Sequence, residues 1–186
     1  MPGIPDLIEP LREGAVALRF GSERDIPEIL IAHQDDPQLH QRLGEQRPPS
    51  GAELGRMAER GPAERAAGRR VTLTILQAGS DDCRGQIYVH PIDWDHDRAG
   101  LGIWVAPALR GTGLARRALG LAGRWLLEAC RLERLEVMTE SGNEAMIHAT
   151  RAAGFVSEGV LRAYLRDGAQ RVDVAVLSLL PGDLHP

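Results

Sequence analysis

Two glycines between a strand and a helix are the most distinctive chemical feature of this sequence. Residues 104–119 read WVAPALRGTGLARRAL, so that Gly111 and Gly113 stand directly before a helical pattern. The first amides of a helix have no partner within the helix and lie at the positive end of its dipole. Because glycine has no Cβ, a ligand can approach its backbone closely. The pattern predicts an anion site, and phosphate is an anion that such loops often bind.

Two well-known phosphate loops do not fit these residues. The nucleoside triphosphate loop ends in Gly-Lys-Ser/Thr, and this sequence contains no lysine. The dinucleotide loop G-x-G-x-x-G is matched at Gly111 and Gly113, and Glu133 or Glu136 lies at the distance of its acidic residue. Its third glycine, however, is Arg116, whose side chain would obstruct packing of the helix on the strand. Only one strand–helix–strand unit is present, so we do not expect a Rossmann fold.

A third pattern fits better. Arg110 to Ala115 match R/Q-x-x-G-x-G/A, and Asn143 begins a match to N-x(10)-G-F-x-x-E-G that continues through Gly154-Phe155 and Glu158-Gly159. Together these motifs resemble the GCN5-related N-acetyltransferase (GNAT) superfamily. The residues that resemble its ribosomal-protein alanine acetyltransferase (RimJ/RimL-like) branch are Arg162, Asp167-Gly168 and Asp173. The resemblance is specific over residues 99–180 and looser before them.

This resemblance implies an acetyl-CoA-dependent N-acetyltransferase, in which acetyl-CoA is a co-substrate. The acceptor would be a primary amine of a small molecule or of a protein N-terminus, which attacks the thioester directly. The missing acid–base groups described below leave a second interpretation open, an acyl-CoA-binding sensor or interaction protein without catalysis.

The resemblance also assigns residues to the cofactor. Trp104 and Val105 would hold the pantetheine arm, Val105 would polarise the thioester carbonyl, and Asn143 would face the arm. Asn143 also fits a helix cap, while Arg116 and Arg117 either add charge near the phosphates or form a solvated helix face. The backbone amides that would cradle the pyrophosphate are those of Arg110, Gly111, Thr112, Gly113, Leu114 and Ala115.

The residues that usually transfer protons in this superfamily are absent. The matching positions are Gly100 for a glutamate base, Thr150 for a tyrosine acid, and Met146 for the serine of the ribosomal-protein branch. We nominate Tyr164, His90 and Glu158 as substitutes for these proton-transfer groups. The alternative is that each of them has only a structural role in its strand. An α-amine with a pKa of about 8 is neutral at pH 7 far more often than a lysine amine at about 10.4. An enzyme without a strong base therefore favours α-amines or similarly acidic amines.

Periodicity places these residues in a mixed α/β fold. We expect strands at 15–20, 69–77, 84–92, 99–106, 134–140, 155–165 and 170–180, and helices at 22–33, 51–66, 114–130 and 142–153. The strands from 69 to 106 follow one another at hairpin distances, and a long helix joins 99–106 to 134–140. This predicts the GNAT fold, with an antiparallel meander, a splayed parallel strand pair and helices on both faces. We expect one domain over 15–182 after an N-terminal tail over 1–14.

Composition limits the partners. With 186 residues and a net charge of −4, the chain lacks the basic surface that nucleic acid requires. No apolar run reaches the roughly 20 residues of a membrane span, and no signal peptide is evident, so a soluble cytoplasmic protein is expected. Cys83 and Cys130 are predicted to be free thiols. Trp94, taken to be exposed, and the apolar N-terminal tail indicate a homodimer contact.

The acidic hairpin at 93–97 begins like a calcium loop, but Arg98 stands where that loop needs glycine and Trp104 where it needs glutamate. We therefore expect no metal. Together with Asp35 and Asp36, these carboxylates are either solvated or line the mouth of the acceptor site and favour a cationic substrate.

Overall fold

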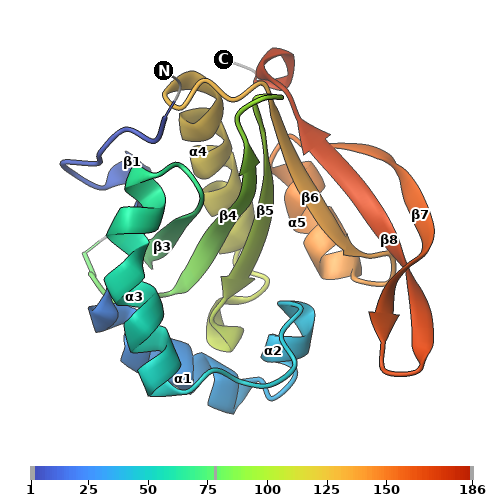
Figure 1. Cartoon of the computed structure of the whole chain (residues 1–186), viewed down its shortest axis with the longest axis horizontal. Coiled ribbons are helices and arrows are strands. Elements are labelled where there is room, and N and C mark those ends of the chain that lie inside the picture. Colours follow the sequence, from blue (N-terminus) through green and yellow to red (C-terminus); the bar gives the residue numbers. More distant parts are fainter. Residues whose placement is uncertain (1–2, 78, 185–186) are drawn as a thin grey trace.

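An eight-stranded mixed sheet forms the centre of the molecule (Figure 1). The structure, a computed structural model, describes residues 3–77 and 79–184. The strands lie in the order β1-β2-β3-β4-β5-β6-β8-β7. Their bounds are Leu11–Glu13 (β1), Val16–Phe20 (β2), Val71–Gln77 (β3), Gly85–Asp93 (β4), Arg98–Val105 (β5), Arg134–Glu140 (β6), Val156–Asp167 (β7) and Gln170–Leu179 (β8). The α-helices are Ile26–Asp35 (α1), Leu39–Arg42 (α2), Gly51–Ala66 (α3), Leu114–Glu128 (α4) and Glu144–Ala152 (α5).

Strand pairing confirms the predicted α/β fold. β1 to β5 pair with their neighbours in sequence as an antiparallel meander, and β5 and β6 are a parallel pair. α4 connects these two strands, because parallel neighbours need a crossover between their ends. The order of the last two strands was not predicted: β8 pairs with β6, and β7 is the edge strand outside it.

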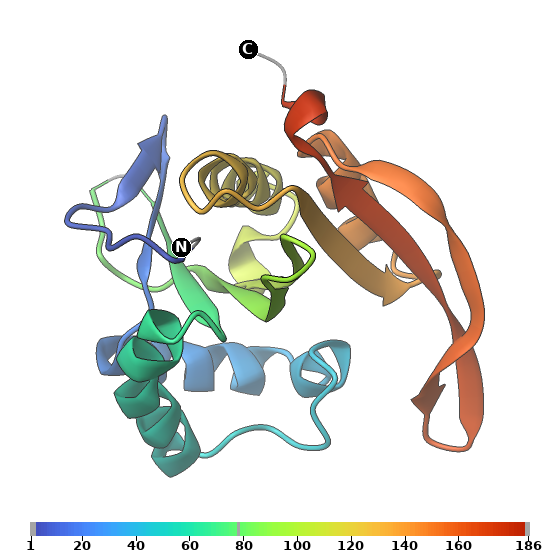
Figure 2. The same cartoon turned by 45° about the horizontal axis from the view of Figure 1, so that its top comes forward.

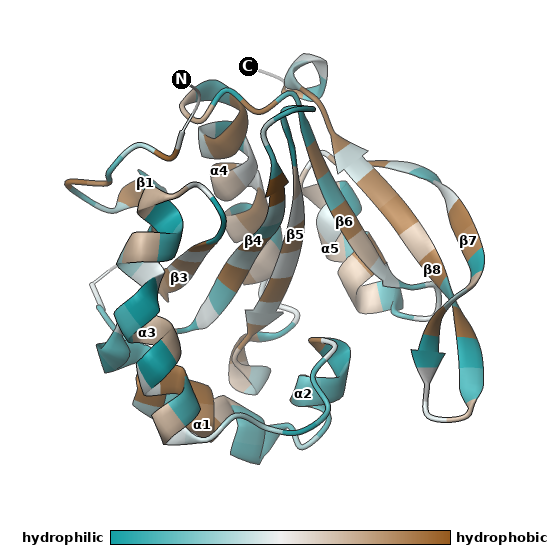
Figure 3. Cartoon of the chain, in the orientation of Figure 1, coloured by the Kyte–Doolittle hydropathy of each residue, from teal (hydrophilic) through white to brown (hydrophobic). Residues whose placement is uncertain are grey.

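Helices cover both faces of the sheet. α4 and α5 lie on one face and α1 and α3 on the other (Figure 2). The larger core, which lies against α4, includes Leu73, Ile87 and Leu119, whereas the smaller core beneath α1 to α3 includes Leu54 and Trp104. In Figure 3 hydrophobic colours follow the central strands, while the outward side of α3 is hydrophilic.

α4 forms because its apolar residues repeat at helical spacing. Leu114, Ala118 and Trp125 are buried on one side, while Arg124 on the other is exposed. A Cβ at Gly123 would lie 2.7 Å from the Leu179 side chain, so this glycine lets α4 pack closely on the sheet.

Several expectations need correction. Trp94 is not exposed: it is partly buried against the core, and its Nε1–H donates to the Gly68 carbonyl at 2.8 Å. The homodimer contact inferred from its exposure therefore has no support at this residue. Leu11–Glu13 of the expected tail forms a strand with β2, and the short helix α2 was not predicted, because four residues show no measurable periodicity.

Two global features concern the environment of the protein. No helix in the described ranges is long and apolar enough to cross a membrane. Cys83 and Cys130 are free and buried, and burial raises the pKa of each thiol to about 12. Both thiols are therefore protonated and unreactive at neutral pH.

Candidate functional site

β5 and β6 pair over their first halves and then separate. Pairing ends at Leu101 and Val137, and Figure 1 shows the strands close together at the top and apart towards the bottom. Along β5, the backbone N–H and C=O groups of successive residues point alternately to β4 and to β6. The N–H of Ala106, just beyond β5, donates to the Arg84 carbonyl next to β4. The N–H and C=O groups of Ile103 and Val105 therefore point to the β6 side. Within the described residues neither makes a backbone hydrogen bond there. We call residues 102–105 the open edge of β5.

The loop that follows the open edge carries amides without partners. Gly111 and Gly113 adopt φ of 77° and 78°, a region that favours glycine. The N–H of Arg110 donates to Pro107 at 3.2 Å and that of Thr112 to Leu109 at 3.4 Å. The other four amides expected to cradle a phosphate have no hydrogen-bond partner in the described part of the chain; they belong to Gly111, Gly113, Leu114 and Ala115. With the positive end of the α4 dipole, they suit an anion.

Two arginines contribute to this loop in different ways. The side chain of Arg117 folds back to the Thr112 carbonyl at 3.4 Å, and its Nε is buried without a partner among the described residues. Arg110 donates to the buried carboxylate of Asp36 at 2.6 Å, and Arg42 pairs with the same oxygen. Although burial raises the pKa of Asp36, these two arginines hold it below its usual value. Asp36 is therefore not a free carboxylate for a cationic substrate; it ties the loop to the end of α1.

Asn143 caps helix α5. Its Oδ1 accepts from the Met146 N–H at 3.3 Å, and its Nδ2 donates to Thr139 at 3.0 Å. The capping interpretation is therefore confirmed, and the side chain is held at the end of β6, the strand that faces the open edge. Thr150, further along α5, is fully buried, and its hydroxyl has no partner among the described residues.

A chain of buried hydrogen bonds joins the open edge to α1. The indole of Trp104 donates to the Tyr88 hydroxyl at 3.1 Å, and that hydroxyl donates to Gln86 at 3.0 Å. Gln86 in turn contacts Thr74 at 3.4 Å, and Thr74 donates to Asp25 at 2.6 Å. The carboxylate at the end of this chain, that of Asp25, pairs with Arg19 and accepts from the backbone N–H of Ser22 at 3.0 Å. Sequence reasoning missed Tyr88, because it resembles any half-buried strand aromatic.

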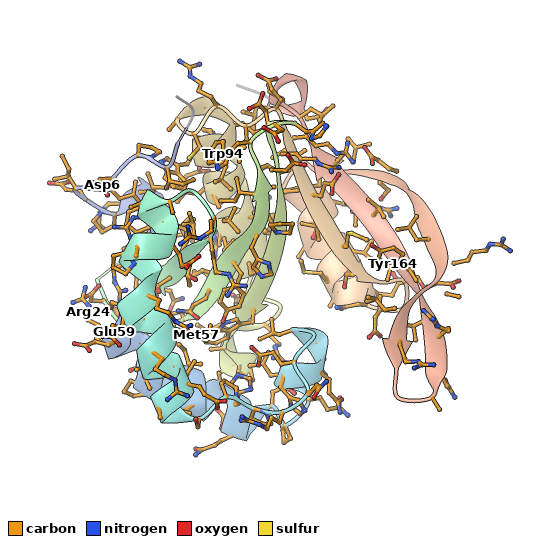
Figure 4. All side chains as sticks on the ribbon, in the orientation of Figure 1. Asp6, Arg24, Met57, Glu59, Trp94 and Tyr164 are labelled. Carbon is orange, nitrogen blue, oxygen red and sulfur yellow. The ribbon has the colours of Figure 1, made fainter. Side chains whose placement is uncertain are left out.

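The nominated proton-transfer residues do not form one cluster. His90 lies on β4, and burial, followed by the charge of Arg70, lowers its pKa. Tyr164 lies half exposed on β7, which β8 and β6 separate from β5, and Figure 4 shows it on the opposite side of the molecule from Met57. Glu158 accepts from both terminal nitrogens of Arg134 at 2.7 and 2.6 Å.

The pairing of Glu158 determines its charge state. The two hydrogen bonds from Arg134, and then one from Ser178 at 2.6 Å, lower the pKa of Glu158 to about 2. A carboxyl group with so low a pKa is a weak base, so this environment does not favour a general-base role.

A cavity of about 250 Å³ lies on the face of the sheet that carries Tyr88 and Trp104, between α1, α3 and strands β2 to β4. Its inner wall includes Tyr88 and Gln86, and Arg60, Arg65 and Arg70 line it from α3 and the residues that follow. No residue of β5 or β6 lines it, so it is distinct from the open edge. Within the described residues no group of three or more His, Cys, Asp or Glu side chains could hold a metal ion.

Comparisons with known proteins agree with this geometry. The family model described as "Acetyltransferase (GNAT) domain" matches residues 16–156. A curated relative, "Putative ribosomal N-acetyltransferase YdaF" of Bacillus subtilis (strain 168), is 28% identical over 96 residues, which are 52% of this chain and 52% of that protein. The chain thus aligns with about half the length of this curated relative.

Solved structures share the fold. The RimJ protein of Mycobacterium smegmatis, determined in complex with CoA-disulfide, has a TM-score of 0.79 at 24% identity, covering 100% of this chain and 92% of that one. The ribosomal-protein-S5-alanine acetyltransferase of Vibrio fischeri has a TM-score of 0.77 at 17% identity, covering 96% of this chain and 100% of that one. Since the family model covers most of the chain, the predicted family is confirmed: this chain belongs to the GNAT acetyltransferase family.

Proposed function

We propose that this protein is an acetyl-CoA-dependent N-acetyltransferase that acetylates a primary amine of a small molecule or of a protein N-terminus. The observation that carries this proposal is the open edge of β5 leading directly into a loop with four unpartnered amides. An extended acyl-thioester arm with a diphosphate at its far end fits this arrangement. Membership of the GNAT family, and the CoA-disulfide complex of the similar RimJ protein, support it.

The residues present fit the diphosphate. The amides of Gly111, Gly113, Leu114 and Ala115 would donate to it, and the orphaned Nε of Arg117 offers a further donor beside them. Arg110 and Thr112, whose amides are already bonded within the loop, would shape the cradle rather than line it with their N–H groups.

The open edge would hold the arm. Val105 would bond it through its backbone N–H and C=O, Trp104 would pack beside it, and Asn143 would face it from α5. Acetyl-CoA supplies the activated acetyl group. A backbone N–H of the open edge near the thioester carbonyl would stabilise the negative charge that develops on that oxygen.

The acceptor class follows from the same chemistry. Because no strongly basic side chain stands on the open edge, we propose α-amines or similarly acidic amines, which are neutral more often at pH 7. We place the reaction in the cytoplasm, since two free buried cysteines suit a reducing compartment.

Calorimetry with CoA and a thiol-release assay with acetyl-CoA test the proposal. The amine panel would include alanine amide, an Ala-initiated tetrapeptide and spermidine. We expect CoA to bind and at least one amine to release thiol. Binding of CoA without thiol release by any amine would instead favour a sensor or interaction protein that has lost catalysis.

A glycine variant tests the cradle. Gly113→Val should weaken CoA binding at least tenfold, because a side chain would stand among the amides and strain a backbone with positive φ. Gly14→Val is the matched control, since Gly14 also has a positive φ and open space around it but lies in the β1–β2 turn. Equal CoA affinity in both variants would show that the loop has been misassigned.

A further inference from the structure

A carboxylate lies beside the point where β5 and β6 separate. Gly100 on β5 is in register with Glu136 on β6, one pair before the last. Side chains at matched positions of neighbouring strands point to the same face. This is the face of Tyr88 and Trp104, opposite the α4 core. Because Gly100 has no side chain, β5 places nothing in front of its own backbone here.

His90 lies on the other side of the same glycine. A Cβ at Gly100 would be only 2.7 Å from the His90 carbonyl oxygen, so β4 approaches Gly100 closely at its bulge. Three adjacent strands therefore present His90, Gly100 and Glu136 side by side. The outer two backbones are roughly 10 Å apart, at about 4.8 Å per strand. The His90 carbonyl occupies the space directly above Gly100, so an acceptor amine would reach Glu136 from the exposed side of its carboxylate.

Arg134 bonds two acidic side chains of this region, Glu136 and Glu158, to different extents. Arg134 donates its Nε to Glu136 Oε1 at 2.7 Å and its two terminal nitrogens to Glu158. Glu158 also accepts from Ser178, so both of its oxygens are engaged. Glu136 Oε2 has no hydrogen-bond partner among the described residues, and a quarter of the side chain is exposed. Of these two carboxylates, only Glu136 therefore keeps an oxygen that can receive a further donor.

We propose that Glu136 is the carboxylate that binds the acceptor's amino group and receives its proton, an inference that rests on the proposed acetyltransferase function. The ammonium form first loses one proton to solvent. The amine nitrogen then forms a bond to the acetyl carbon while the carbon–sulfur bond breaks. The second proton passes from nitrogen to Glu136 Oε2 and then to solvent, and the thiolate takes a proton from solvent. Glu158 is a positioning residue, because it keeps the terminal nitrogens of Arg134 away from Glu136.

Glu136→Gln is the direct test, because it keeps the size of the side chain and the bond from Arg134. With the most active amine of the panel, we expect kcat/KM to fall on the order of 100-fold. CoA affinity by calorimetry should stay within twofold. A second readout is binding of alanine amide to the protein–CoA complex at pH 6, where the amine is cationic; its affinity should fall about tenfold. Glu133→Gln, on the exposed segment before β6, is the matched control and should change neither quantity.

Two further variants distinguish the carboxylates. Glu136→Asp keeps the charge and should retain more activity than Glu136→Gln, which guards against a general folding defect. Glu158→Gln should lower kcat/KM less than Glu136→Gln does, and it should have no further effect in the Glu136→Gln background. A larger loss from Glu158→Gln, or full activity in Glu136→Gln, would overturn the assignment. These outcomes require an active wild-type enzyme, so they differ from failure of the proposed function, in which wild type itself releases no thiol.

Discussion

Gly100 occupies a position on β5 where a larger residue would collide with the neighbouring strand. A Cβ there would lie 2.7 Å from a backbone oxygen of β4, and backbone cannot move aside as a flexible side chain can. The glycine that replaces the superfamily's usual glutamate is therefore tied to the bulge in β4. Gly100→Ala should lower the free energy of unfolding by about 1–3 kcal/mol, as overpacking of a tight site does.

Gly102→Ala is the matched comparison for this prediction. Two residues further along β5, its Cβ would lie 4.0 Å from the Tyr88 ring, an ordinary contact. Urea denaturation of both variants should show a change of no more than about 0.5 kcal/mol for Gly102→Ala. Equal effects of the two substitutions would mean that the bulge adjusts without cost.

Arg110 acts through its side chain at a position where the sequence motif suggested only its backbone. Its guanidinium reaches Asp36 at the end of α1 and fixes the loop against that helix. Arg110→Met should raise the KM for acetyl-CoA roughly tenfold, because binding must then order the loop, and kcat should stay near wild type. Asp36 keeps Arg42 as its partner, so the fold should persist.

The control for this variant is Arg124→Met, which removes an exposed arginine of α4 that pairs only with Glu13 in the described chain. Steady-state kinetics of both variants with acetyl-CoA would check the prediction. An unchanged KM in Arg110→Met would show that the ion pair does not position the loop.

The two edges of the strand β5 differ in their backbone hydrogen bonds. The amides of Gly102, Trp104 and Ala106 face β4, whereas those of Ile103 and Val105 face the open edge. Amide hydrogen exchange should therefore be slow in the first group with or without CoA. Exchange of the Ile103 and Val105 amides should be fast in the free protein and at least tenfold slower with saturating CoA, because the arm would pair with them.

Nuclear magnetic resonance can measure this alternation residue by residue. Protection of all five amides without CoA would mean that β6 or another segment closes the edge in solution. Uniform slowing of the whole strand by CoA would indicate general stabilisation rather than pairing along one edge.

The elements could largely be predicted from sequence because each is recorded in local patterns. α4 has its apolar spacing, and the loop has Gly111 and Gly113, so an anion site could be predicted there without tertiary information. Contacts between distant segments left no local trace. The register of Gly100 with Glu136 and the pairing of Arg110 with Asp36 depend on how strands and helices meet. Tyr164 lies on the predicted hairpin after Glu158, but the sequence does not show that β8 and β6 separate this strand from β5.

For the whole molecule, arginine–carboxylate pairs join segments that are remote in sequence. Arg134 on β6 pairs with Glu158 on β7, although β8 lies between these two strands. This ion pair adds a side-chain link between the last hairpin and the rest of the sheet. Arg110 likewise joins the loop before α4 to the end of α1. In both pairs the folded state keeps the carboxylate charged, because the arginine lowers its pKa.

This charge pattern sets the direction of the acid response. Glu158 has a pKa of about 2 in the folded protein and an ordinary value of 4.5 when unfolded, so the unfolded state binds its proton first as the pH falls. The stability that its pairing contributes is complete above about pH 5 and disappears as the pH approaches 2.

Glu158→Gln removes this pH-dependent contribution to the free energy of unfolding. Urea denaturation between pH 7 and 2 should therefore show wild type more stable than the variant by a constant amount down to about pH 5. That difference should shrink towards pH 2, and salt should reduce it, because the pair is partly exposed to solvent. A difference that stays constant to pH 2 would assign the contribution of Glu158 to packing or neutral hydrogen bonds instead of its charge.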